Sequence, residues 1–200
     1  MEAVIFDLGN VLLPFNWDLA ADRFCARTGC SRRELDEYIA TTPFARELSL
    51  GRMSKEAFYR QLSRDFSFDG TYEEFASIWS EIFTPDEEMI RLAERLRGRH
   101  RRFLLSNTNP IHMDYIFAHY PFVRGFDGLV LSHEVGLLKP DRRIFELIRD
   151  RFALDPAGTV FIDDIAEHVE AAKTVGFHGI IHRDAKTTEA ELTRLGVVPI

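Results

Sequence analysis

The chain has 200 residues, of which 46% are hydrophobic and 28% charged, and its formal net charge is −7. This length is enough for one sizeable core with an insertion, but not for several independent domains. The negative charge argues against a nucleic-acid partner, which requires a positive surface. No apolar run is long enough to cross a membrane and no leader pattern is present, so we expect a cytoplasmic protein without a membrane partner.

The chain begins with a short apolar run, AVIF at 3–6, which predicts a buried strand. Residues 16–97 then show only helix signals, with aromatic and aliphatic residues at helical spacing. Capping-box patterns at Ser31, Thr71 and Thr84 indicate three helix starts within this region. The region therefore predicts a helical bundle rather than further strands.

The bundle is predicted to be an insertion after the first strand. We place this helical cap at residues 15–83 and the α/β core at residues 1–14 and 84–200. A helix from Pro85 to Leu96 is expected to return the chain to the core. The basic run that follows, RLRGRHRR, is expected to be a solvated turn.

Four more apolar runs follow in the second half of the chain. They lie at 102–106, 128–131, 159–162 and 179–182. The runs lack apolar–polar alternation, which is typical of a parallel sheet covered on both faces. Helical patterns separate the later runs, so we predict a Rossmann-like, doubly wound α/β core.

Polar residues directly follow the strands, where the ligand crevice of an open parallel sheet forms. They are a carboxylate, a hydroxyl with an amide, a lysine and a pair of carboxylates: Asp7, Ser106, Asn107, Lys139, Asp163 and Asp164. Crowded carboxylates repel one another unless a cation intervenes, and a hard ion such as Mg²⁺ suits oxygen ligands. A hydroxyl and a lysine facing an anion on that metal would stabilise a phosphoryl group, with Asp7 as a covalent nucleophile.

Four ordered motifs carry a resemblance to a known family. FDLGNV at 6–11, LSNT at 105–108, GLLKPD at 136–141 and FIDD at 161–164 resemble the signatures of the haloacid dehalogenase (HAD) superfamily. The helical cap after the first motif is similar as well. The chain most resembles the phosphatase branch that includes α-D-glucose-1-phosphate phosphatases. The resemblance implies a phosphoric monoester hydrolase for a small phosphorylated metabolite such as a sugar phosphate, and we expect a monomer or homodimer.

The resemblance also implies a role for each matching residue. Asp7 would be the nucleophile that forms an aspartyl-phosphate intermediate, and Ser106 and Lys139 would complete the catalytic set. The substrate-binding set would be Gly9, Asn10, Ser106, Asn107 and Lys139. The Mg²⁺ site would comprise Asp7, the Gly9 carbonyl, Asp164 as direct ligand and Asp163 beside it.

Gly9 departs from the family pattern, because most phosphatases of this family carry a second Asp there that transfers protons. Glycine keeps the carbonyl ligand but loses proton transfer, an effect typically worth about 10²–10⁴-fold. We therefore expect esters with an acidic leaving oxygen, unless His112 or His168 supplies the proton. Two alternatives stay open: a 2-haloacid dehalogenase, which also lacks the second Asp, and a catalytically impaired protein that binds a phosphorylated ligand.

Residues of the predicted cap are candidates for substrate contacts. Phe15, Asn16 and Trp17 follow the first motif and are expected to line the cap entrance. The segment at 45–54 is typical of a substrate loop between cap helices, with Glu47 or Arg52 as contacts for a sugar hydroxyl or a second anion.

Overall fold

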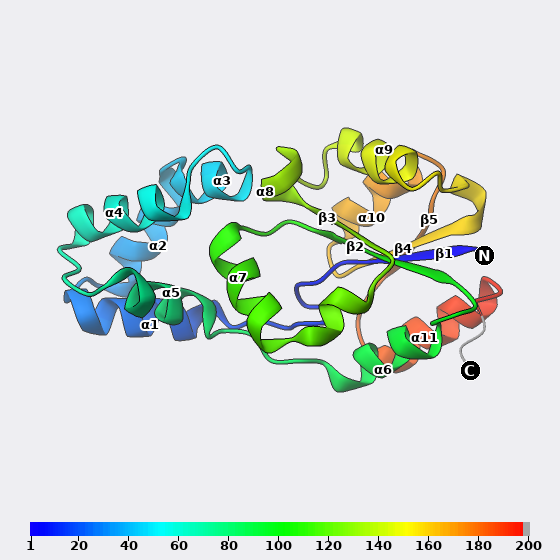
Figure 1. Cartoon of the computed structure of the whole chain (residues 1–200), viewed down its shortest axis with the longest axis horizontal. Helices are drawn as coiled ribbons and strands as arrows, with labels where there is room; N and C mark the ends of the chain where they lie inside the picture. Colours follow the sequence, from blue (N-terminus) through cyan, green and yellow to red (C-terminus); the bar gives the residue numbers. More distant parts are fainter. Residues whose placement is uncertain (198–200) are drawn as a thin grey trace.

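A fully parallel five-stranded sheet forms the centre of the molecule, in the order β3-β2-β1-β4-β5 (Figure 1). The computed structural model describes residues 1–197. The strands are β1 (Ala3–Phe6), β2 (Arg101–Ser106), β3 (Gly128–Leu131), β4 (Thr159–Asp163) and β5 (His178–Ile181). All five predicted strands are present, each within one residue of its predicted bounds, so the α/β fold is confirmed.

The apolar strands are explained by layers on both sides of the sheet. In β1, Val4 and Phe6 face one hydrophobic cluster, whereas Ala3 and Ile5 face another. All four residues are fully buried. Since neither face meets water, an uninterrupted apolar run is the stable sequence for such a strand.

Helices cover the two faces of the sheet in separate layers (Figure 1). One face is covered by α6 (Glu87–Arg95), α7 (Pro110–His119) and α11 (Ala185–Arg194), and the other by α9 (Arg142–Arg151) and α10 (Ala166–Lys173). Three short helical turns are η1 (Pro121–Gly125), α8 (Ser132–Val135) and η2 (Pro156–Gly158). Within residues 1–197, no helix combines the length and the apolar character needed to cross a bilayer.

A bundle of five helices lies at one end of the molecule, between β1 and α6 in the chain (Figure 1). Its helices are α1 (Trp17–Thr28), α2 (Arg32–Thr41), α3 (Phe44–Ser49), α4 (Lys55–Phe66) and α5 (Tyr72–Ser80). Their buried faces form a cluster rich in aromatic residues, among them Phe24, Phe58, Phe75 and Trp79. Ile111 of α7 joins the same cluster, so the bundle packs directly on the core.

The two chain crossings between bundle and sheet lie side by side. Phe15 and Phe83 form an isolated antiparallel bridge. The Thr84 N–H donates to the Pro14 carbonyl at 2.8 Å. The predicted boundary between cap and core falls at this crossing, and the division into two domains stays a prediction.

The predicted start of the returning helix is wrong by two residues. The helix α6 begins at Glu87, not Pro85, and Asp86 instead of Thr84 caps its free N–H groups. The reason is tertiary, because the Asp86 N–H donates to the Leu12 carbonyl at 3.0 Å. This pairing with the outgoing chain keeps residues 84–86 out of the helix.

The basic run after α6 is only partly the solvated turn that was expected. Arg102 is 2% exposed. Its guanidinium donates to the Ala93 carbonyl (3.1 Å), the Gly125 carbonyl (2.6 Å) and the Glu94 carboxylate (2.8 Å). A buried charge is tolerated when paired and hydrogen-bonded in this way, so Arg102 ties α6 to the sheet.

Candidate active site

Asp7 lies directly after β1 at the carboxyl edge of the sheet. Its N–H donates to the Ile162 carbonyl at 2.8 Å, which extends the ladder one residue beyond the strand. The Leu8 N–H donates to Asp7 Oδ1 at 2.7 Å and orients the carboxylate. The chain then turns tightly, with the Leu13 N–H bound to the Leu8 carbonyl (2.8 Å) and Asn10 at a φ of +54°. The turn thus presents the Asp7 carboxylate at the sheet edge.

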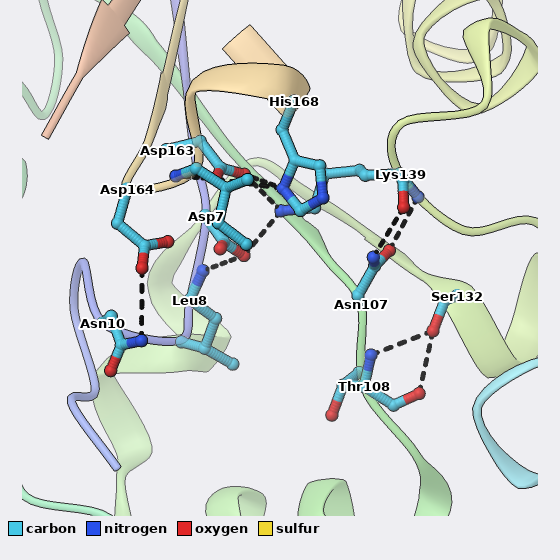
Figure 2. Close-up of polar contacts among 11 residues, drawn as sticks. Asp7, Leu8, Asn10, Asn107, Thr108, Ser132, Lys139, Asp163, Asp164 and His168 are labelled. Atoms are coloured by element: carbon cyan, nitrogen blue, oxygen red, sulfur yellow. Dashed lines mark hydrogen bonds and ion pairs between the residues drawn. The ribbon is translucent and has the colours of Figure 1, made fainter. Parts of the chain in front are cut away.

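A buried lysine holds two carboxylates of the site together (Figure 2). Lys139 Nζ lies 2.8 Å from Asp7 Oδ1 and 2.6 Å from Asp163 Oδ2. Asn107 fixes the lysine backbone, since its Oδ1 accepts the Lys139 N–H (2.8 Å) and its Nδ2 donates to the Lys139 carbonyl (2.9 Å). The Asn107 amide therefore positions Lys139, and its predicted contact with the substrate stays a prediction.

Asp163 is saturated with donors and fully buried. Beyond Lys139, it accepts the Ile165 N–H at 2.8 Å, and His168 Nδ1 lies 3.0 and 3.1 Å from its two oxygens (Figure 2). Burial opposes ionisation, but the bond from His168 and the charge of Lys139 hold the pKa of Asp163 below its usual range. His168 Nδ1 is thus engaged with Asp163, and His168 does not line the cavity at Gly9. Its role as a proton donor stays a prediction.

Asp7, Asp163 and Asp164 form a candidate site for a cation. One carboxylate oxygen of each lies within 4.8 Å of the others. Burial raises the pKa of Asp7 to about 6; Lys139 counters this rise and the charge of Asp163 adds to it. A cation would favour the ionised form, and an all-oxygen donor set suits a hard divalent ion. Asp164 is oriented by Asn10, whose Nδ2 donates to Oδ2 at 3.2 Å.

A cavity of about 220 Å³ opens beside these groups. Gly9, Ser106 and Asn107 line it together with Phe15 and His112. A side chain at Gly9 would project toward Phe15, because a Cβ built there lies 3.2 Å from the phenyl ring. The structure thus brings the predicted hydroxyl, glycine and amide to one space, while their roles stay predictions.

His112 lines the cavity as a neutral side chain. Its Nδ1 accepts from Asn109 Nδ2 (3.1 Å) and its Nε2–H donates to the Trp79 carbonyl (3.2 Å). Burial lowers the pKa of His112 to about 4. At neutral pH it carries no extra proton to donate, which argues against the acid role considered for it.

Two of the predicted specificity residues lie elsewhere. Glu47 and Arg52 form an ion pair with each other at 3.5 Å. Neither lines the cavity at Gly9, and Arg52 is exposed. The expected loop at 45–54 is partly helical, because α3 occupies residues 44–49.

Sequence reasoning missed the residue that joins the bundle to the sheet edge. Ser132 Oγ accepts the Thr108 N–H (2.9 Å) and lies 2.8 Å from the Thr108 carbonyl (Figure 2). The same oxygen lies 2.8 Å from the Ser49 carbonyl. Three distant segments thus meet at one fully buried hydroxyl. Its only sequence signal is its position directly after β3.

Comparison with known proteins places this site in a family. The family model for haloacid dehalogenase-like hydrolases matches residues 1–176. The chain is 30% identical to a D-ribitol-5-phosphate phosphatase of Bacteroides thetaiotaomicron, over 96% of this chain and 97% of the relative. It is 29% identical to a sesquiterpene phosphatase of Aspergillus oryzae, over 97% and 96% of the two chains.

A solved structure has the same fold. The crystal structure of a HAD family enzyme of Bacteroides thetaiotaomicron, in complex with magnesium and inorganic phosphate, superposes with a TM-score of 0.83 and 20% identity. The match covers 92% of this chain and 94% of the other. The family that the four sequence motifs predict is confirmed.

Proposed function

Since the chain belongs to the haloacid dehalogenase-like hydrolases, we propose that it is a Mg²⁺-dependent phosphatase for a small phosphate monoester. The observation that carries this proposal is the buried Lys139, which bridges Asp7 and Asp163 at the sheet edge. A cation held against a nucleophilic carboxylate, beside the Ser106 hydroxyl, suits a phosphoryl group whose charge redistributes during transfer. The relatives support it, because two of them are phosphatases.

The first chemical step is transfer of the phosphoryl group to Asp7. All hydrogen bonds that the described residues make to this carboxylate go to Oδ1. That arrangement leaves Oδ2 as the attacking atom. The Oδ2–P bond forms as the bond from phosphorus to the ester oxygen breaks, and the leaving oxygen takes a proton from water, because Gly9 offers none.

The second step returns the enzyme to its starting state. A water oxygen attacks phosphorus and the Oδ2–P bond breaks, which restores the Asp7 carboxylate. One proton of that water leaves on hydrogen phosphate, and the other neutralises the hydroxide left by the first step. Lys139 stays within hydrogen-bonding distance of Asp7 throughout and keeps the carboxylate in place. Asp163 contacts Lys139 and is itself bound by His168. Asp163 and His168 are therefore positioning residues for Lys139.

The donor set fits Mg²⁺. Asp7 and Asp164 would hold it with the Gly9 carbonyl, while the contacts of Asp163 to Lys139 and His168 place it beside the metal. When bound, Mg²⁺ supplies positive charge that stabilises the phosphoryl oxygens. The magnesium and phosphate in the related crystal structure support this assignment.

The test is release of inorganic phosphate from a panel that includes phenyl phosphate, α-D-glucose 1-phosphate and D-ribitol 5-phosphate, with Mg²⁺ and with EDTA. We expect release only with the metal, and loss of release in Asp7→Asn. Asp150→Asn is the matched control, because Asp150 is exposed on α9 and pairs with Arg149, far along the chain from the proposed site residues.

Two further assays test the alternatives, a dehalogenase and a protein that binds a phosphorylated ligand without catalysis. Chloride release from 2-chloropropionate with EDTA present would replace the phosphatase with a dehalogenase. Thermal stabilisation by phosphate with Mg²⁺, without turnover of any ester, would indicate a protein that only binds a phosphorylated ligand. Selective turnover of α-D-glucose 1-phosphate or D-ribitol 5-phosphate would support the sugar phosphate that the family resemblance implies.

A further inference from the structure

A second cavity adjoins the one at Gly9 and has a different character. Its volume is about 280 Å³, and it shares Ser49, Asn109 and His112 with the first. Its other walls are apolar side chains of the bundle: Trp17, Ile39, Ala45, Leu48, Phe58 and Trp79. These three shared residues form the boundary between the two cavities, so the second cavity lies directly beside the first on the side of the bundle.

The polar groups at that boundary are already bonded within the protein. Asn109 Oδ1 accepts the His112 N–H at 3.0 Å, and the two side chains bind each other. Ser49 Oγ donates to the Ala45 carbonyl (2.9 Å), and the Ser49 carbonyl accepts from Ser132 Oγ (2.8 Å). The hydroxyl proton of Ser49 and one N–H of the Asn109 amide are thus committed before a ligand arrives.

The interior of the second cavity offers few partners to a polar ligand. Trp17 Nε1–H is already donated to Asp36 at 3.1 Å. Among the residues that the structure describes, no charged side chain lines this cavity. A hydroxyl placed there loses its hydrogen bonds to water without equivalent replacement, whereas a hydrocarbon gains by leaving water.

We infer that the leaving group of the substrate carries a hydrocarbon or aromatic portion that occupies this second cavity. The inference rests on the proposed function, because it takes the phosphoryl group to bind at Asp7. It assigns Trp17, Ala45 and Phe58 to recognition of the leaving group. Polyol phosphates are then poorer substrates than apolar esters of equal leaving-group acidity.

A series of para-substituted phenyl phosphates tests this directly. Phenyl, 4-ethylphenyl and 4-butylphenyl phosphate increase in apolar surface while the acidity of the leaving phenol stays nearly constant. We expect kcat/KM to rise about threefold to fourfold for each methylene that is buried. Replacing 4-propylphenyl by 4-(2-hydroxyethyl)phenyl phosphate, which exchanges a methyl for a hydroxyl, should lower kcat/KM by about tenfold.

A variant that fills the second cavity tests whether the alkyl chain of the substrate binds there. Ala45→Leu on α3 adds volume inside the cavity, and we expect it to flatten the dependence of kcat/KM on chain length. Ala40→Leu on α2 is the matched control, because Ala40 is exposed and should keep the wild-type dependence. If Ala45→Leu does not fold, the wild-type series still decides the question.

Binding of non-hydrolysable phosphonates separates this inference from the proposed function. In calorimetry with Mg²⁺, 4-butylphenylphosphonate should bind more tightly than phenylphosphonate. Turnover of phenyl phosphate with no gain from longer chains in kcat/KM or binding would overturn the inference and leave the phosphatase intact. Tighter phosphonate binding without turnover of any ester would overturn the phosphatase and support the apolar site.

Discussion

The two adjoining cavities differ in what their walls offer a ligand. The cavity at Gly9 lies beside Asp7, which directly follows β1, and Lys139, which lies in the loop between α8 and α9. The cavity in the bundle is walled by aromatic and aliphatic side chains from separate helices. The comparison separates the two proposals: the reaction is assigned to the sheet edge, and selection of the leaving group is assigned to the bundle.

The largest expected effect is removal of the nucleophile at the sheet edge. Asp7→Asn should lower kcat by about 10⁴-fold or more, because a neutral amide oxygen is too weak a nucleophile to form the acyl phosphate. The measurement is steady-state phosphate release from phenyl phosphate. Retained activity in this variant would show that the reaction does not take place at Asp7, and would contradict the assignment of different roles to the two cavities.

The next effect is on stability and concerns the ion pairs of the same site. Lys139→Met leaves Asp7 and Asp163 buried without their shared cation, so the free energy of unfolding in EDTA should fall by about 3–5 kcal/mol. Lys55→Met is the matched control, because it removes a partly exposed pair with Asp114 and should cost at most about 1 kcal/mol. Urea unfolding measures both, and equal losses would contradict the buried network.

An increase in phosphatase activity is expected from a substitution at Gly9, which lines the cavity beside Asp7. Gly9→Asp should raise kcat for alkyl phosphates by about 10²-fold, because a carboxyl group there can protonate the leaving oxygen. Phe15 is 45% exposed and can yield the few tenths of an ångström that the new side chain needs. Phenyl phosphate, whose leaving group needs no proton, should gain little.

Gly9→Asn is the control for that gain, because it has the same shape without an acidic proton. An equal increase in Gly9→Asn would attribute the effect to space or polarity, not to proton transfer. No increase in Gly9→Asp would show that missing acid catalysis does not limit this enzyme.

The smallest expected effect concerns His112, which lies between the cavities. Burial lowers its pKa to about 4 from an ordinary value of 6.5, so the unfolded chain takes up a proton first as the pH falls. The contribution of neutral His112 to the free energy of unfolding is fully present above pH 6.5 and declines as the pH falls toward 4. By pH 5 the free energy of unfolding should be lower by about 2 kcal/mol on this account.

Comparing unfolding of the wild type and His112→Gln at pH 7.5 and pH 5 isolates this contribution. The wild type should lose more stability between the two pH values than the variant does. An equal loss in both proteins would mean that His112 is not buried as a neutral side chain.

The strand ends could be predicted from the sequence because parallel strands buried on both faces are continuous apolar runs. Each run ends at the sheet edge, so the residues that follow, such as Asp7 and Asp163, had to lie near one another. The cluster of Asp7, Asp163 and Asp164 could be predicted for the same reason. The contacts that support it could not be predicted, because the pairing of Asn107 with Lys139 and of His168 with Asp163 depends on side-chain packing in the folded protein.

The bundle was predictable as helices but not as a cavity. Trp17 and Phe58 have helical spacing typical of core residues, and both do pack in the aromatic cluster. Only the tertiary arrangement leaves a space between them and α7. Arg102 makes the same point, since a basic run looks solvated until the chain folds Ala93 and Gly125 around it.

The most direct test of the central claim is to trap the phosphoryl group on the enzyme. The protein is mixed with phenyl phosphate and Mg²⁺, quenched in acid within a turnover, digested at low pH and analysed by mass spectrometry. We expect a phosphorylated peptide that carries the modification on Asp7, and none in Asp7→Asn. Rapid phosphate release with no modification at Asp7, or with one on another residue, would contradict the account.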